Sequence, residues 1–67
     1  MKIFAERIKQ LRLSKGLYQT DVAKETGFSQ AAIARWEAGS QTPNLEVAVK
    51  LAKFFEVSTD YLLGLED

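Results

Sequence analysis

The sequence predicts an all-α domain built from five short helices. Apolar residues recur at intervals of three and four, which is typical of helices with one buried face. Glycines and one proline interrupt this pattern at intervals. No stretch alternates apolar and polar residues as a half-buried strand does. With 67 residues, the chain has room for one small domain, 1–67.

The first helix is expected over about 3–14. Phe4, Ile8 and Leu11 recur at i, i+4 and i+7 and form one apolar stripe along it. Gly16 follows, and glycine adopts the left-handed conformation that commonly ends a helix.

The second and third helices are expected over about 19–26 and 30–37. Gly27 ends the second helix, which has only two turns and so requires tertiary packing. Ser29 is a favourable N-cap for the third helix, and Gly39 ends it.

The fourth helix is expected after Asn44, another favourable N-cap, and the fifth after Ser58. Gly64 ends the fifth helix. The inner face of the fourth helix is expected to consist of apolar residues at helical spacing, namely Leu45, Ala48, Leu51, Ala52 and Phe55.

Composition excludes several classes of function. The chain has no cysteine and no histidine, so it has no disulfide, no thiolate metal site and no histidine base. No nucleophile–base pair or metal-ligand cluster is present in the sequence, which argues against an enzyme, a metal site or a cofactor. Apolar runs are only a few residues long, so we expect no membrane span or signal peptide and a cytoplasmic location.

Charge is distributed unevenly along the chain although the net charge is zero. Residues 1–35 carry seven basic and three acidic side chains, whereas residues 36–67 carry two basic and six acidic ones. The first half is therefore the one that would meet an anionic partner.

The third helix has an unusual exterior. If Ile33 and Trp36 face inward, the outer positions are small or uncharged apart from one arginine: Gln30, Ala31, Ala34, Arg35 and Ala38. A solvated helix face usually carries long charged side chains. Either this face has no function, or a partner approaches it very closely.

Two short helices joined by the three residues 27–29 form a helix-turn-helix. The chain from about 8 to 64 resembles the Cro/repressor-type helix-turn-helix family, also called the XRE family. The matching residues, in chain order, are Gln19, Ala23, Gly27, Ser29, Ile33, Trp36, Glu37, Gly39, Pro43 and the run 58–64.

The resemblance implies a compact five-helix, lambda-repressor-like DNA-binding domain. Such a protein is a sequence-specific transcriptional regulator of double-stranded DNA, typically a repressor that binds a two-fold operator as a homodimer. It needs no cofactor, no small-molecule ligand and no membrane. The alternative is a protein-interaction module such as an antitoxin-like partner. That role needs a second region, which is not expected because the sequence ends three residues after Gly64.

The third helix is expected to contact base edges in the major groove through Gln30, Ala31, Ala34 and Arg35. The Gln30 amide matches adenine, and alanine methyl groups match thymine methyl groups while allowing close approach. Arg35 suits guanine or a phosphate, and its alternative role is an ion pair with a surface carboxylate. Trp36 is expected in the core rather than stacked on a base.

Phosphate contacts are expected from polar residues around the two helices. In related repressors the glutamine that matches Gln19 contacts a phosphate and braces the glutamine that matches Gln30. The full set of candidates is Tyr18, Gln19, Ser29, Ser40, Gln41, Thr42 and Asn44. Asp21 and Glu25, four residues apart on the second helix, are expected to form a solvated face rather than a catalytic pair.

Five further features concern orientation, strain, charge and assembly. Arg12 and Glu37 match a pair that joins the first helix to the third in related repressors. Tyr18 stands where Ser, Thr or Asn commonly caps the second helix, and Glu56 stands where glycine or asparagine often ends the fourth. The loop 38–44 lacks lysine and arginine. The dimer interface is expected near the fifth helix, at Phe54, Thr59, Leu63 and Leu65.

Overall fold

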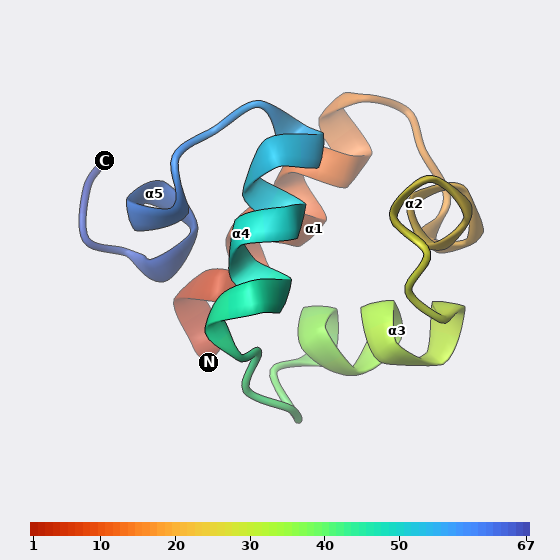
Figure 1. Ribbon diagram of the computed structural model, residues 1–67, viewed down its shortest axis with the longest axis horizontal. Helices are drawn as coiled ribbons and strands as arrows, with labels where there is room; N and C mark the ends of the chain where they lie inside the picture. Colours follow the sequence, from red (N-terminus) through yellow and green to blue (C-terminus); the bar gives the residue numbers. More distant parts are fainter.

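The computed structural model describes residues 1–67 and contains only helices, so the predicted all-α fold class is confirmed. The five helices are α1 Lys2–Ser14, α2 Gln19–Thr26, α3 Gln30–Ala38, α4 Leu45–Phe55 and α5 Thr59–Leu63 (Figure 1). α1 begins and α3 ends one residue beyond the expected bounds. The longest helix has 13 residues, and none is long and apolar enough to cross a membrane.

Three helices begin at side-chain caps that the sequence predicts. Ser29, Asn44 and Ser58 each accept a hydrogen bond of 2.9–3.0 Å from the backbone N–H three residues further on. Each cap satisfies a backbone donor that the first turn leaves without a partner. These local hydrogen bonds determine where α3, α4 and α5 start.

The start of α2 is stabilised differently. The Tyr18 side chain makes no capping hydrogen bond. Instead the Asp21 carboxylate accepts a hydrogen bond of 2.7 Å from the Tyr18 backbone N–H, and its charge lies at the favourable end of the helix dipole. Asp21 thus has a role in holding the first turn of α2 that the sequence analysis did not predict.

One hydrophobic core joins all five helices. α4 lies across the middle of the molecule with α1 behind it, α2 and α3 on one side and α5 on the other (Figure 1). The core consists of ten buried residues, Phe4, Ile8, Val22, Ile33, Trp36, Ala48, Leu51, Ala52, Phe55 and Leu62. Because Ile33 and Trp36 belong to it, α3 presents its opposite face to solvent, as expected.

The inner face of α4 differs from the expected one at its first residue. Leu45 is 70% exposed, so its assignment to the inner face is wrong. It is the first residue of the helix and lies beyond the core. Phe55 is buried, whereas its neighbour Phe54 is half-buried and packs edge-to-face against it, with ring centroids 4.9 Å apart. Phe54 therefore packs against the buried core without being one of its members.

Glu56 ends α4 in the left-handed conformation, with φ 59° and ψ 42°. It is the only non-glycine residue with a positive φ. A residue with a Cβ atom is strained there by about 1–2 kcal/mol. Glycine removes this strain, but part of the gain is lost because glycine has a larger backbone entropy in the unfolded chain.

A Glu56→Gly variant is therefore expected to unfold with a free energy about 0.5–1 kcal/mol higher than the parent. Urea titration followed by the fluorescence of Trp36, the single tryptophan, measures this difference. Glu6→Gly is the matched control, because Glu6 is exposed within α1 and glycine there lowers stability by about 1 kcal/mol. Equal losses in both variants would contradict the assigned strain.

Candidate nucleic-acid interface

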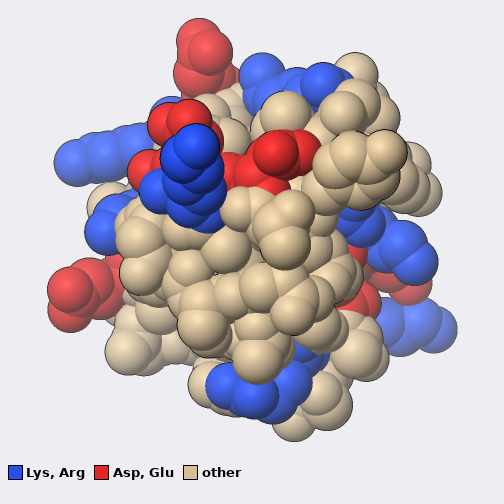
Figure 2. All heavy atoms as spheres, turned by 90° about the vertical axis from the view of Figure 1, so that its right-hand side faces the viewer, with Lys and Arg blue, Asp and Glu red and all other residues tan.

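The outer face of α3 is small and uncharged over most of its length. Gln30, Ala31, Arg35 and Ala38 are exposed, and Ala34 is half-buried. The side of the molecule that carries α2 and the start of α3 is uncharged in its middle, with charged groups around it (Figure 2). A flat helix face of this kind lets another surface come close to the backbone.

A chain of hydrogen bonds runs from the interior to the first residue of this face. Arg12 on α1 donates through Nε and Nη2 to the two carboxylate oxygens of Glu37 on α3, at 2.6 and 2.9 Å. Gln19, the first residue of α2, donates from Nε2 to Glu37 Oε1 at 3.1 Å. Gln30 donates from Nε2 to Gln19 Oε1 at 2.7 Å. Three helices thus meet at one set of polar contacts.

The inner part of this chain is a buried, bidentate ion pair. The side chains of Arg12 and Glu37 are only 10% and 5% exposed. The hydrogen bonds that Arg12 donates to Glu37, together with the negative charge of Glu37, raise the pKa of Arg12 despite its burial, so the guanidinium stays charged. Arg12 also donates from Nη1 to the Leu17 carbonyl oxygen at 2.8 Å, which attaches the segment before α2 to α1.

Arg35 contacts the loop that follows α3. Its Nε donates to Gln41 Oε1 at 2.8 Å, and its carbonyl oxygen accepts a hydrogen bond from the Ser40 hydroxyl. The only ion pair in the structure is Arg12–Glu37, so the alternative of an ion pair between Arg35 and a surface carboxylate is wrong. The two Nη atoms of Arg35 remain available at the edge of the flat face.

The candidate phosphate-binding residues lie at helix starts and in one loop. Tyr18 is 77% exposed and precedes Gln19 at the start of α2. Ser29 and Asn44 cap α3 and α4 through their oxygen atoms, which leaves the Ser29 hydroxyl hydrogen and the Asn44 amide N–H groups available. The exposed loop between these helices holds the others, Ser40, Gln41 and Thr42. No three carboxylates gather to form a metal site.

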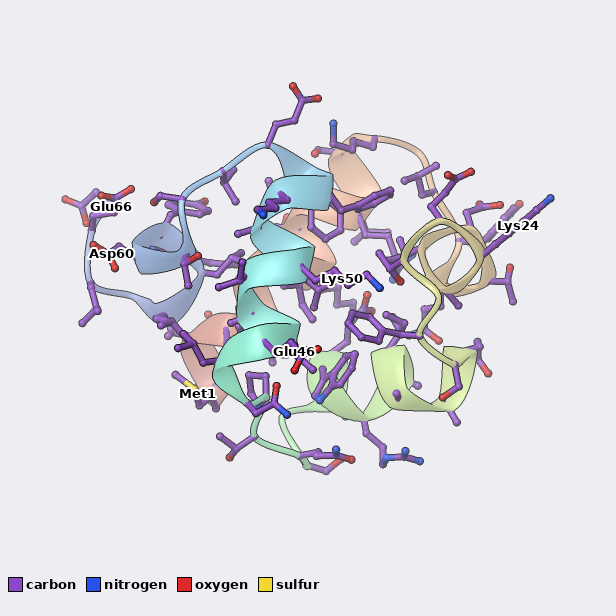
Figure 3. The ribbon with its side chains drawn as sticks, viewed as in Figure 1. Met1, Lys24, Glu46, Lys50, Asp60 and Glu66 are labelled. Atoms are coloured by element: carbon purple, nitrogen blue, oxygen red, sulfur yellow. The ribbon has the colours of Figure 1, made fainter.

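Lys50 contacts the turn between α2 and α3, which the sequence analysis did not predict. It projects from α4 toward the turn between α2 and α3 (Figure 3), and its Nζ lies 5.1 Å from the centroid of the Phe28 ring. Phe28 in turn packs edge-to-face on Trp36, with centroids 5.1 Å apart. This stack fixes the turn to the body of the protein. A single lysine in an amphipathic helix carries no sequence signal for such a contact.

The predicted dimer residues surround α5 at the opposite end of the molecule. Leu65 is 73% exposed, and Phe54, Thr59 and Leu63 are half-buried. Arg7 on α1 was not predicted to matter, yet its guanidinium lies 4.2 Å from the centroid of the Tyr61 ring on α5. It also donates to the carbonyl oxygens of Tyr61 and Glu66, which holds α5 and the residues after it on α1.

Comparisons with known proteins agree with this geometry. A family model described as helix-turn-helix matches residues 8–62. The HTH-type transcriptional activator BcrR of Enterococcus faecalis is 41% identical over 64 residues, which are 96% of this chain and 31% of BcrR. The HTH-type transcriptional regulator MJ0272 of Methanocaldococcus jannaschii is 38% identical over 61 residues, which are 91% of this chain and 92% of that protein.

Among solved structures, the chain is similar to the P22 c2 repressor protein, crystallised in complex with a synthetic operator. The TM-score is 0.84 and the sequence identity 34%, over 92% of this chain and 94% of the repressor chain in that crystal. The chain spans between 31% and 58% of the length of several other relatives, BcrR among them.

Proposed function

Because the chain belongs to the helix-turn-helix family of transcriptional regulators, we propose that it is a repressor that binds a two-fold DNA operator as a homodimer. The observation that carries the proposal is the flat outer face of α3, which begins with the braced Gln30. A helix with its side chains is about 10–12 Å across, and the major groove is about 12 Å wide. Small side chains at the centre of the contact let the helix backbone approach the bases closely.

Bases are read in this proposal by Gln30, Ala31, Ala34 and Arg35. The Gln30 amide pairs with adenine, and the two alanine methyl groups contact thymine methyl groups. Arg35 lies further along α3, where its free Nη atoms reach a guanine or a phosphate. The N-terminal part of such a recognition helix carries most of the base contacts, which gives Gln30 and Ala31 the largest share.

Phosphates on either side of the groove are bound by neutral donors. Tyr18 and Gln19 flank the N-terminus of α2, where free backbone N–H groups and the helix dipole favour an anion. Ser29, Ser40, Gln41, Thr42 and Asn44 supply further donors around α3 and the loop after it. These contacts position the helix without reading sequence.

Dimerisation in this proposal uses the surface around α5, formed by Phe54, Thr59, Leu63 and Leu65. Two-fold pairing there separates the two α3 helices by about 34 Å, one turn of B-DNA. The similarity to the P22 repressor supports repression, whereas the similarity to BcrR, named an activator, leaves room for the opposite effect. A reporter gene placed behind the selected operator distinguishes the two.

Selection from a random duplex pool tests the proposal directly. We expect enrichment of a palindromic site with half-site centres about 10 bp apart. Sedimentation of the protein with and without this duplex should show two chains on each site. Failure to enrich any duplex would refute DNA binding, and a single chain on an asymmetric site would refute the dimer.

The affinity for DNA is expected to fall only gradually as the salt concentration rises. Residues 39–44 carry no cation, and in this proposal three basic groups of each chain neutralise phosphates, namely Lys15, Lys24 and Arg35. Lys24 extends outward from α2 (Figure 3). Since each neutralised phosphate contributes about −0.9 to the slope of log K against log salt, a dimer is expected to show a slope near −5. Titrations at several salt concentrations measure it.

The variant Lys24→Gln is expected to reduce the size of that slope by about two for the dimer, one phosphate on each half-site. Lys53→Gln is the matched control, because Lys53 is exposed on α4, and it should leave the slope unchanged. A parent slope steeper than about −8 would show that more cations reach the DNA than this assignment allows.

A further inference from the structure

We propose that Arg7 is a positioning residue for dimerisation. It fastens α5 and the residues after it to α1, so that Leu63 and Leu65 meet a second copy of the chain in one fixed arrangement. The inference rests on the proposed function, because that proposal places the two-fold interface around α5. Arg7 acts through α5 and is not itself one of the proposed interface residues.

α5 is too short to keep its place without tertiary contacts. It has five residues, and a helix of that length is unstable in water by itself. Leu62 is its only buried residue. Two backbone hydrogen bonds, of 2.8 and 3.2 Å, close the turn that ends α5 within residues 60–65. These bonds shape the turn, but they do not attach it to the rest of the protein.

One guanidinium on α1 supplies that attachment. Nη1 of Arg7 carries two N–H groups and donates to two carbonyl oxygens, that of Tyr61 within α5 and, at 2.7 Å, that of Glu66 beyond it. The Arg7 Cζ atom also lies 4.2 Å from the centroid of the Tyr61 ring. Arginine can make both kinds of contact at once, because its flat group stacks on an aromatic ring while its N–H groups donate in the plane. Its positive charge is also favourable at the C-terminal end of a helix.

Close packing against the same face of α1 accompanies the Arg7 contacts. Ile3 precedes Arg7 by four residues and so lies one turn away on that face. A Cβ atom built at Gly64 would lie only 2.8 Å from Ile3 Cγ2, so the backbone after α5 approaches α1 as closely as glycine allows. The Ser58 hydroxyl, at the start of α5, donates to the Glu66 carboxylate. The segment 58–66 is therefore closed on itself and fitted to α1 as a unit.

This attachment matters for pairing because Leu63 and Leu65 flank the turn that Arg7 holds. A surface that is ordered beforehand loses less conformational entropy when it binds. Without Arg7, each of the two chains would have to order its own segment on pairing. α1 also packs against α3, so the same helix carries both the dimer surface and the helix that is proposed to read bases. Arg7 therefore helps to set the separation of the two α3 helices on the operator.

The test separates pairing from DNA contact. Arg7→Met keeps an unbranched stem beside Tyr61 and removes the charge and the N–H donors, while Leu62 still anchors α5. Sedimentation equilibrium is expected to show a dimer weaker by at least about 30-fold, because two charge-assisted hydrogen bonds are lost in each of the two chains. Fluorescence anisotropy is expected to show a similar loss on the full operator. Binding to a duplex with one half-site should stay within about twofold of the parent, a result that an unfolded variant could not give.

Two further variants sharpen the assignment. Arg7→Lys keeps the charge but loses the flat, forked group, so its dimer should be weaker than the parent's by about three- to tenfold. Lys9→Met is the matched control, because it also removes one positive charge from α1, at an exposed position that makes none of these contacts. Its dimer should be within about twofold of the parent's. Circular dichroism and Trp36 fluorescence verify folding of each variant.

The outcomes separate this inference from the proposed function. A folded Arg7→Met variant that pairs as tightly as the parent would overturn the role of Arg7 and leave the dimer standing. Equal losses on the half-site and on the full operator would also overturn it, because Arg7 would then act on DNA contact and not on pairing. A parent that remains a single chain both free and on the operator would overturn the proposed dimer together with the role of Arg7.

Discussion

An Ala31→Leu variant is expected to fold like the parent and to lose at least about a hundredfold in operator affinity. Ala31 is exposed on α3, so a larger side chain meets no neighbour within the protein. Leucine also suits a helix nearly as well as alanine. In the major groove the added carbons meet the base edges and hold the backbone away. Gln30 and its neighbours then lose contacts worth about 1–3 kcal/mol each.

Fluorescence anisotropy with the selected operator measures this loss. Gln10→Leu is the matched control, because Gln10 is exposed on the side of α1 opposite the buried Ile8, and it adds a similar apolar group. It should bind within about twofold of the parent. Unchanged binding by Ala31→Leu would show that the flat face of α3 does not enter the groove.

Replacing Arg12 by methionine is expected to lower the free energy of unfolding by about 3–5 kcal/mol. The variant leaves the Glu37 carboxylate buried without its partner and frees the Leu17 carbonyl oxygen. A 67-residue domain has roughly 3–10 kcal/mol of stability in total, so much of the variant is expected to be unfolded at 37 °C. Urea titration followed by Trp36 fluorescence measures the change.

The double variant Arg12→Met with Glu37→Leu is expected to recover most of that loss. It replaces both charges by apolar groups of similar volume, and such replacements of buried ion pairs are often neutral or stabilising. Recovery of stability would show that the loss in Arg12→Met comes from the buried carboxylate left without its partner. A loss below about 1 kcal/mol in Arg12→Met alone would mean that water reaches the pair more freely than its burial indicates.

Signals carried by neighbouring residues made most of the fold predictable. Ser29 and Asn44 cap helices by accepting hydrogen bonds from the backbone N–H three residues further on, and Gly27 and Gly39 end α2 and α3 in the left-handed conformation. Trp36 enters the core because its spacing from Ile33 puts both on one face. Each of these depends on a few consecutive residues, which the sequence displays directly.

The sequence analysis fell short where contacts between a helix and the rest of the protein decided the outcome. Leu45 shares the helical spacing of the buried residues, but the core does not extend to the first turn of α4. The hydrogen bond that Asp21 accepts from the Tyr18 backbone N–H was not predicted either, because it depends on the conformation of the chain before α2. Hydrophobic spacing shows which face is apolar and not how far the neighbouring helices cover it.

Helix propensity, capping and periodicity act over one or two turns, so the residues alone predict five helices, their approximate ends and the small outer face of α3. The hydrogen-bonded chain of Arg12, Glu37, Gln19 and Gln30 follows from the packed fold instead. Glu37 lies 25 residues from Arg12 and 18 from Gln19 along the chain. The angles at which α1, α2 and α3 cross bring them within hydrogen-bonding distance, and those angles come from packing of the whole core.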